Sequence, residues 1–549
     1  MRLTTQGQVT LFFGALTLLF ALPILIDPAH RLVPLSSDTR LFLWTLEWHL
    51  RALTTHPLTV FEAPIFYPAH HALAFSENLL GLAPLTAPVL AASKNPVLAL
   101  NVALLAATWL SALGAYALAR RLGASTGGAL LAGLVFAFGP PRFARSAQVF
   151  LFMTPGLPWT FAFLEDYRSR GRPRSLHLAI LVFTWQCAAS LHMGLFTAFA
   201  GAAWLLLRAT RDRALPARIV RDLGLPGLAA GAALTVLAVP YLAVRNEQGL
   251  VRTLGAVADW DPNLASFLAS PSLLHEALTA ALSGLSGAHD APRTYLFPGF
   301  VTVGLSLYAL RRWPAADRDR FIDASPGWAW LGAGLVLSLG TTLPFYGWLY
   351  AVLPTLDMVR VPSRFFVIAT LGLAILAAAG LDRIRSPAIR RALVVAALLE
   401  FAIDVRAVEY RVDVPEADRW LASESGPVVV AEVPTTGSER AARSSQLNSE
   451  YMLHAAAHGW PTIHGYSGLV PQKSEALFRL LEDFPSDESL ANLESLGVTH
   501  VVVHRGLYRP GERPLLGRFD DPAFLDRLTL VHESGDDGVY RLPLSRARR

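Results

Sequence analysis

Residues 9–26 read VTLFFGALTLLFALPILI, an apolar run without a single charged side chain. A bilayer core about 30 Å thick takes roughly 20 apolar helical residues to cross. Arg2 precedes the run, and Asp27-Pro28 follows it. The next residues, AHRL (29–32), do not resemble the small-residue site at which a signal peptide is cleaved. We therefore expect an uncleaved membrane anchor.

Apolar runs of this kind recur along the first 404 residues. Hydrophobic residues make up 53% of the 549-residue chain and charged residues only 16%. Soluble domains average roughly 25% charged residues, so this composition argues against a soluble enzyme. The single cysteine, Cys187, excludes a disulfide scaffold. The further runs lie at 97–119, 127–139, 149–167, 176–190, 193–208, 223–244, 297–310, 326–340, 363–380 and 391–404. We expect an all-α polytopic membrane protein with about eleven spans over residues 1–404.

Arginine clusters determine the expected orientation. Five segments between the apolar runs are rich in arginine: 120–121, 168–174, 208–221, 311–320 and 383–391. Positively charged loops stay in the cytoplasm. These five share one side only if residues 78–92, with Pro84 and Pro88, form a short, broken or re-entrant segment rather than a crossing. The N-terminus is then inside, whereas the C-terminus, the first loop (residues 27–96) and residues 245–296 are outside.

The remaining residues, 405–549, differ in character. Acidic residues exceed basic ones by five there, whereas basic residues exceed acidic ones by ten in residues 1–404. Apolar runs predict strands at 427–434, 498–504 and 528–532, with helices between them at 440–458 and 473–481. We expect a small extracytoplasmic α/β domain, the C-terminal domain. Its acidic charge argues against nucleic-acid binding.

Two carboxylates in the first loop are the candidate catalytic residues. Asp38 lies in SSDTR (36–40), and Glu77 lies in SEN (76–78), just before the chain returns to the membrane. A carboxylate near the interface could accept the proton of an acceptor hydroxyl. Together the two could hold a metal ion such as Mg²⁺ or Mn²⁺ through their oxygen atoms. The alternatives are a helix N-cap for Asp38 and a capping or solvated group for Glu77.

Residues 41–53, LFLWTLEWHLRAL, fit two patterns. Positions 44–51 alternate between apolar and polar side chains, as in a strand. The leucine, glutamate, arginine and alanine content favours a helix, and the two tryptophans favour the membrane interface. We interpret the segment as a juxtamembrane helix.

Arginines outside the five clusters need another role. A guanidinium stays charged and can hold a phosphate through two donors. We expect substrate or phosphate binding from Arg40, Arg142, Arg145, Arg360 and Arg364. Arg245 and Arg252 flank a further outer segment. The alternative for each is a contact with lipid headgroups or an ion pair with an acid such as Asp357.

Two motifs add candidate binding residues. His192, in LHMG (191–194), lies between two apolar runs and is a candidate substrate contact, or a histidine hydrogen-bonded between helices. The sequence HGYSG (464–468) suggests a binding loop, with a packed turn as the alternative. The sequence contains no zinc-ligand spacing, Walker loop or dinucleotide fingerprint.

The chain resembles bacterial membrane glycosyltransferases of the GT-C superfamily, particularly their YfhO-like and related branches. The resemblance rests on Asp38 in a long first loop and on FYP (66–68), SEN (76–78), the Arg142/Arg145 segment, RVPSRF (360–365) and HGYSG. It implies an enzyme of the bacterial inner membrane that moves a sugar from a polyprenyl phosphate to a lipid, glycan or protein acceptor, with Asp38 in catalysis. Many relatives have two adjacent acids there. Here Ser37 and Thr39 flank Asp38, so Glu77 would have to supply the second carboxylate.

Two other functions stay open. A transporter or flippase for a lipid-linked glycan predicts paired repeats and charges near the middle of the bilayer, but the runs carry few charges and no obvious duplication. A non-catalytic envelope assembly protein predicts that residues 405–549 are essential while the carboxylates of the first loop are not.

Overall fold

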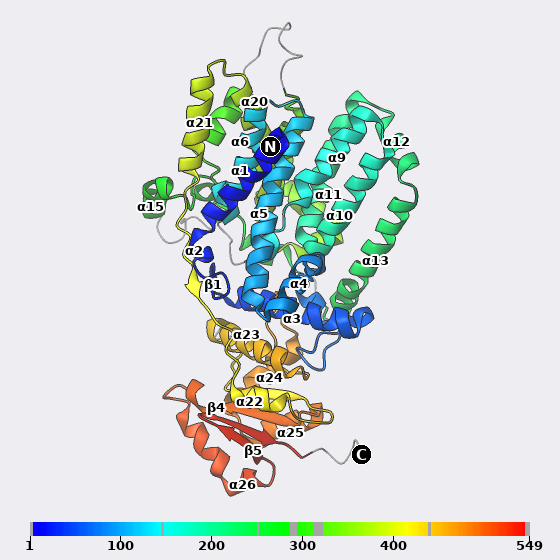
Figure 1. Ribbon diagram of the computed structural model, residues 1–549. Helices are drawn as coiled ribbons and strands as arrows, with labels where there is room; N and C mark the ends of the chain where they lie inside the picture. Colours follow the sequence, from blue (N-terminus) through cyan, green and yellow to red (C-terminus); the bar gives the residue numbers. More distant parts are fainter. Residues whose placement is uncertain are drawn as a thin grey trace.

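The protein consists of a helical bundle with a smaller, sheet-containing unit at one end (Figure 1). The structure is a computed structural model. It describes residues 4–143, 148–249, 252–285, 294–310, 322–437 and 441–543. The sheet is formed by C-terminal residues, so the expectation of a mainly helical protein with a small C-terminal sheet is confirmed.

The apolar segments of the bundle form helices. A helix satisfies its own backbone hydrogen bonds, whereas the bilayer core offers the backbone no hydrogen-bond partners. The elements of the bundle are α1 (Thr5–Phe20), α2 (Leu22–Leu25), α5 (Pro96–Arg121), α6 (Thr126–Phe138), α7 (Pro140–Phe143), α8 (Val149–Phe152), α9 (Gly156–Arg170), α10 (Pro173–Ala189), α11 (Leu191–Arg211), α12 (Leu215–Asp222), α13 (Gly224–Glu247), α14 (Leu254–Ala258), α15 (Glu276–Leu285), α17 (Phe300–Tyr308), α18 (Ser325–Ser338), α19 (Pro344–Val352), α20 (Phe366–Asp382) and α21 (Pro387–Glu400).

Four helices in the described part of the chain are long and apolar enough to cross a membrane. They are Pro96–Arg121, Leu191–Arg211, Gly224–Glu247 and Pro362–Asp382. Other expected spans are shorter helices, such as α6 with 13 residues and α18 with 14. The count of about eleven spans therefore stays a prediction.

Two expected spans are broken helices. The first run divides at Ala21 into α1 and α2, with Pro23 in the first turn of α2. The run 149–167 divides into α8 and α9 on either side of Pro155. The buried amide of Gln186 accepts a hydrogen bond from Gly156 N and donates one to Met153 O, which satisfies the backbone groups freed at this break.

The four arginine-rich segments among the described residues lie at the end of the bundle remote from the C-terminal domain (Figure 1). Acidic side chains join several of them. Glu165 accepts hydrogen bonds from Arg168 and Arg208, and Arg208 also pairs with Asp323 at 2.6 Å. The segment 311–320 lies outside the described residues. The described segments are consistent with one common side for the basic loops.

The first loop contains two helices that lie at the other end of the bundle. The longer one is α3 (Ser37–Thr55), which confirms the helical interpretation of residues 41–53. Its N-cap is Ser36, whose hydroxyl accepts a hydrogen bond from Thr39 N, so the capping alternative for Asp38 is wrong. The second is α4 (Ala83–Ser93), only 11 residues long, as expected for a short segment here.

The C-terminal domain is built on a four-stranded sheet. The strand order is β3-β4-β6-β5, with β3 parallel to β4 and the other pairs antiparallel. The strands are β3 (Val430–Val433), β4 (His500–His504), β5 (Thr529–Ser534) and β6 (Asp537–Arg541). The helices are α22 (Glu416–Leu421), α23 (Ala441–His458), α24 (Gln472–Leu480), α25 (Asp487–Leu496) and α26 (Pro522–Leu525). The three expected strands are present, and β6 is an addition.

Several contacts hold the first loop to the C-terminal part of the chain. The two-stranded sheet pairs β1 (Arg31–Leu32) with β2 (Val408–Glu409). Helix α23 packs against α3, and between them Arg40 and Glu450 form an ion pair of 2.7 Å. The N-terminal turn of α3, which carries Asp38, is therefore fixed against the C-terminal domain.

Candidate active site

A cavity of about 820 Å³ lies between the first loop, the bundle and the C-terminal domain. The first loop contributes Asp38 and the segment 74–77, and the bundle contributes residues of α11, α13 and the segment 357–364. The C-terminal domain contributes residues of α23 and most of the HGYSG motif. Distant parts of the sequence therefore line one partly open cavity in which polar and apolar side chains are mixed.

Asp38 lies on the wall of this cavity and receives a hydrogen bond from the C-terminal domain. The hydroxyl of Tyr466, in HGYSG, donates to Asp38 Oδ1 at 2.8 Å. Burial and the neighbouring Asp38 carboxylate raise the pKa of Tyr466 above its usual range, so the phenol stays protonated and donates. Residues 465–468 of HGYSG therefore line the cavity, and a binding role for this loop stays a prediction.

Four arginines line the same cavity: Arg245, Arg252, Arg360 and Arg364. Arg245 pairs with Asp357 at 2.8 Å, and Arg252 donates to the carbonyl oxygens of Asp357 and Met358. The ion-pair alternative is therefore confirmed for Arg245.

Arg360 and Arg364 are held by aromatic rings. Arg360 is exposed and stacks over Trp260 at 4.7 Å, and within the part of the chain that the structure describes no carboxylate pairs with it. Arg364 stacks over Phe150 at 5.2 Å and approaches His192 Nε2 at 3.5 Å. Stacking of this kind fixes the plane of a guanidinium and leaves its edge donors directed at other groups.

Glu77 and His192 form a second polar part of the cavity wall. Glu77 is buried and accepts hydrogen bonds from Leu191 N at 2.7 Å and His192 N at 3.0 Å. It also pairs with His192 Nδ1. The carboxylate thus caps the N-terminus of α11 and orients the imidazole, so the capping alternative for Glu77 is confirmed.

These contacts bear on the metal site expected from Asp38 and Glu77. Both oxygen atoms of Glu77 already accept hydrogen bonds from α11, and Asp38 Oδ1 accepts one from Tyr466. A metal ion requires free carboxylate lone pairs directed at a common point. Glu77 Oε2 and both oxygens of Asp38 keep lone pairs besides these hydrogen bonds, so the metal site of Asp38 and Glu77 stays a prediction.

Two candidate arginines lie away from the cavity wall. Arg40 pairs with Glu450 and stacks on Tyr410 between α3 and the C-terminal domain. Arg142 donates to Thr154 Oγ1 at 2.6 Å and Phe152 O at 2.8 Å, beside the break between α8 and α9. Arg145 lies outside the described residues.

The sequence did not predict that Tyr241 belongs to this site. Its hydroxyl accepts a hydrogen bond from Asn78 and donates one to Ser76 O, on either side of Glu77. A tyrosine near the end of an apolar run was the available signal, but such residues are common at membrane interfaces. The segment SEN is therefore fixed to α13.

Comparison with known proteins identifies the fold. No protein-family model and no curated protein matches the chain. The chain is similar to the cryo-EM structure of the arabinofuranosyltransferase AftD from Mycobacteria, with a TM-score of 0.56 and 16% identity over 99% of this chain. That alignment covers only 40% of AftD.

A second solved structure matches over nearly its full length. It is ArnT from Cupriavidus metallidurans in the apo state, with a TM-score of 0.52, 12% identity, and 97% of each chain covered. Identities this low concern the fold and not the activity. The chain therefore shares the fold of these two proteins, which is the GT-C fold.

Proposed function

We propose that the chain is a membrane glycosyltransferase that moves a sugar from a polyprenyl phosphate to a lipid, glycan or protein acceptor. The supporting observation is that Asp38 and the arginines Arg360 and Arg364 line one cavity between the bundle and the C-terminal domain. A lipid-linked donor needs its headgroup at the bilayer surface and its chain among helices. A cavity at the end of an apolar bundle meets both needs.

The proposed reaction follows from the charges around the cavity. The acceptor hydroxyl oxygen attacks the anomeric carbon of the sugar, and its proton passes to Asp38 as general base. The bond between the anomeric carbon and the phosphate oxygen breaks, and the polyprenyl phosphate leaves with the electron pair. Arg360 and Arg364 stabilise the negative charge that develops on this leaving group.

In the proposed site, contacts between side chains position the groups that line the cavity. Glu77 positions His192 and the start of α11, and His192 in turn lies beside Arg364. Tyr466 keeps Asp38 in one orientation toward the acceptor. Glu77 and Tyr466 therefore have positioning roles that their own contacts support.

We further propose that this cavity faces the outer side of the bacterial inner membrane. The described arginine-rich segments lie at the opposite end of the bundle, and such segments stay in the cytoplasm. The first loop and the C-terminal domain are outside in this arrangement, and the N-terminus is inside.

The test compares cells that lack the chain with cells that produce it again in wild-type or altered form. Asp38→Asn keeps the size of the side chain and removes the base, so we expect transfer to fall by about 10²–10⁴-fold. Glu62→Gln is the matched control, because Glu62 lies in the same loop but pairs with His71 away from the cavity. Mass spectrometry of lipid-linked and envelope glycans should show the same missing sugar in the deletion and in Asp38→Asn.

Two outcomes contradict the proposal. Full restoration of the glycans by Asp38→Asn, at wild-type protein levels, removes Asp38 from the chemistry and favours transport or assembly. A deletion strain with unchanged lipid-linked and envelope glycans removes the transferase activity altogether.

A further inference from the structure

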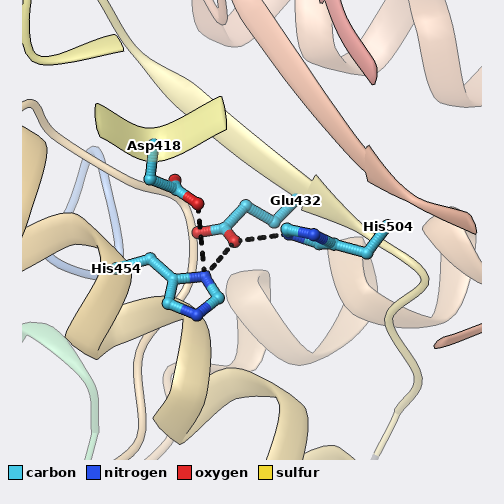
Figure 2. A group of neighbouring side chains, drawn as sticks. All are labelled: Asp418, Glu432, His454 and His504. Atoms are coloured by element: carbon cyan, nitrogen blue, oxygen red, sulfur yellow. Dashed lines mark hydrogen bonds and ion pairs between the residues drawn. The ribbon is translucent and has the colours of Figure 1, made fainter. Parts of the chain in front are cut away.

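Four ionisable side chains meet in the interior of the C-terminal domain, away from the cavity. Figure 2 shows Asp418, Glu432, His454 and His504 pointing toward one another. Each offers one ligand atom, and these atoms all lie within 4.8 Å of one another. Glu432 Oε2 lies 2.8 Å from His454 Nδ1 and 2.9 Å from His504 Nε2, and Asp418 Oδ2 lies 3.6 Å from His454 Nδ1. Four ligands around a tetrahedral zinc ion lie about 3.3 Å apart.

The four residues come from four elements that face one another. Asp418 is on α22, Glu432 on β3, His454 on α23 and His504 on β4. Adjacent parallel strands β3 and β4 direct Glu432 and His504 to the same face of the sheet, which α22 and α23 cover. The cluster therefore connects both helices to the centre of the sheet.

Two of these residues carry buried oxygen atoms with no hydrogen-bond partner. Asp418 and Glu432 are both 0% exposed. Both oxygens of Asp418 and Oε1 of Glu432 are buried without a hydrogen-bond partner among the described residues. The imidazole nitrogens of His454 and His458 lie 3.6 Å and 4.0 Å from the Asp418 carboxylate, beyond hydrogen-bond distance. Buried carboxylate oxygens without hydrogen bonds cost free energy, so a cation bound between these side chains would stabilise the arrangement.

The surroundings of His504 provide a second indication. Its Nε2 faces the cluster, while its Nδ1 lies 3.0 Å from Asp537 Oδ1 on β6. A carboxylate on the far nitrogen of an imidazole is the usual partner of a metal-binding histidine, because it fixes the tautomer and the ring orientation. With Nδ1 protonated toward Asp537, Nε2 presents its lone pair to the cluster.

We propose that Asp418, Glu432, His454 and His504 bind one zinc ion as a structural site. Nitrogen and oxygen ligands of this kind suit Zn²⁺, and four protein ligands complete its tetrahedral shell without an open position for a substrate. The charges also balance, since the two carboxylates neutralise a divalent ion and both imidazoles are neutral. All four side chains are buried, as in a closed structural site.

This site has a role separate from the proposed glycosyl transfer. Helix α23, which carries His454, also contributes Ser444, Ser445 and Asn448 to the cavity wall. Asn448 Oδ1 lies 2.8 Å from His464 Nδ1, at the start of HGYSG. A zinc ion that fixes α23 to the sheet therefore holds the wall of the cavity in place.

The experiment uses the full-length protein purified in detergent, freed of metal with a chelator and then given zinc chloride alone. We expect about one zinc per chain by mass spectrometry, and a higher melting temperature with zinc than without it. Asp418→Asn and His504→Gln should bind less than about a tenth of this amount. Asp537→Asn should weaken binding by about 10–100-fold.

His500→Gln is the matched control. His500 is buried on the same face of β4, four residues before His504, and bonds Thr499 instead of the cluster. Its variant should keep the full zinc content. Equal loss of zinc in His500→Gln and His504→Gln would point to general unfolding and would overturn the assignment of these four ligands.

A spectroscopic measurement on the wild-type chain keeps the test independent of folding defects in the variants. Cobalt(II) in place of zinc should give the intense visible absorption of a tetrahedral site. A wild-type chain that stays free of zinc after loading, with an unchanged melting temperature, would overturn the proposal and leave a proton-sharing network of the same side chains. A stoichiometric metal other than zinc, or a six-coordinate cobalt spectrum, would also overturn it.

Discussion

The hydroxyl of Tyr466 and the carboxylate of Asp38 form a hydrogen bond of 2.8 Å between residues that are 428 positions apart in the sequence. The bond joins the C-terminal domain to the first turn of α3, which is the place where the first loop meets the cavity. In the proposed reaction this bond determines the direction in which the base faces the acceptor. The C-terminal domain is then part of the active site rather than an appendage to it.

Replacing Tyr466 with phenylalanine tests this role. The ring stays in place, but a hydrogen bond to a charged group, worth about 1.5–3 kcal/mol, is lost. We expect the rate of transfer to fall by about tenfold or more, with little change in protein level. The measurement is sugar transfer in membrane vesicles prepared from cells that produce each variant. Tyr67→Phe, in the FYP motif of the first loop and absent from the cavity wall, is the control. Unchanged transfer in Tyr466→Phe would contradict a positioning role.

Removing Arg360 should weaken binding of the donor phosphate. Its guanidinium lines the cavity and stacks on Trp260 without pairing with a carboxylate in the described part of the chain. We expect Arg360→Ala to raise the KM for the polyprenyl-phosphate donor about tenfold or more, and Arg360→Lys to restore part of the loss. Arg406→Ala is the control, because Arg406 is 86% exposed and pairs with Asp404 outside the cavity. A KM that stays at the wild-type value in Arg360→Ala would exclude Arg360 from phosphate recognition.

Close packing of α18 against α20 places glycines at the contact, among them Gly334. A Cβ atom at Gly334 would lie 2.2 Å from Ala369 N, in the backbone of α20. We expect Gly334→Ala to force the two helices apart and to cost about 1–3 kcal/mol. Gly332→Ala, on the same helix, would meet nothing within 4 Å and should leave stability unchanged. The two variants are compared by thermal unfolding in detergent. The quantity measured is the fraction of protein that stays monodisperse as the temperature rises. Equal melting temperatures would show that α18 and α20 can separate at no cost.

Much of the fold could be predicted from the periodicity and charge of the sequence. Long apolar runs gave α5, α11, α13 and α20 directly, and apolar runs in the acidic C-terminal part gave β3 and β4. Hydropathy does not show the breaks near Ala21 and Pro155. The break at Pro155 depends on the side-chain amide of Gln186, which bonds Gly156 N and Met153 O, and a hydropathy scale contains no information on such a contact. Helix lengths within the bundle likewise depend on packing between neighbours.

The candidate site was predictable only in part. Asp38 and HGYSG were recognised as separate features, but a contact across 428 positions leaves no trace in local sequence. The cluster in the C-terminal domain had a local signal that was missed. Glu432 interrupts an apolar strand, VVVAEV (428–433), and histidines stand at both ends of HVVVH (500–504). Charged or imidazole groups on the buried face of a strand require partners, although the sequence does not name them.

The pairing of β1 with β2 has a consequence for the order in which the protein is made. Residues 31–32 leave the ribosome early, but their partner strand at 408–409 is synthesised only after the last helix of the bundle. Tyr466 follows still later. During translation the first loop therefore stays without its partner strand until most of the chain has been made, and a nascent or truncated chain has no assembled cavity.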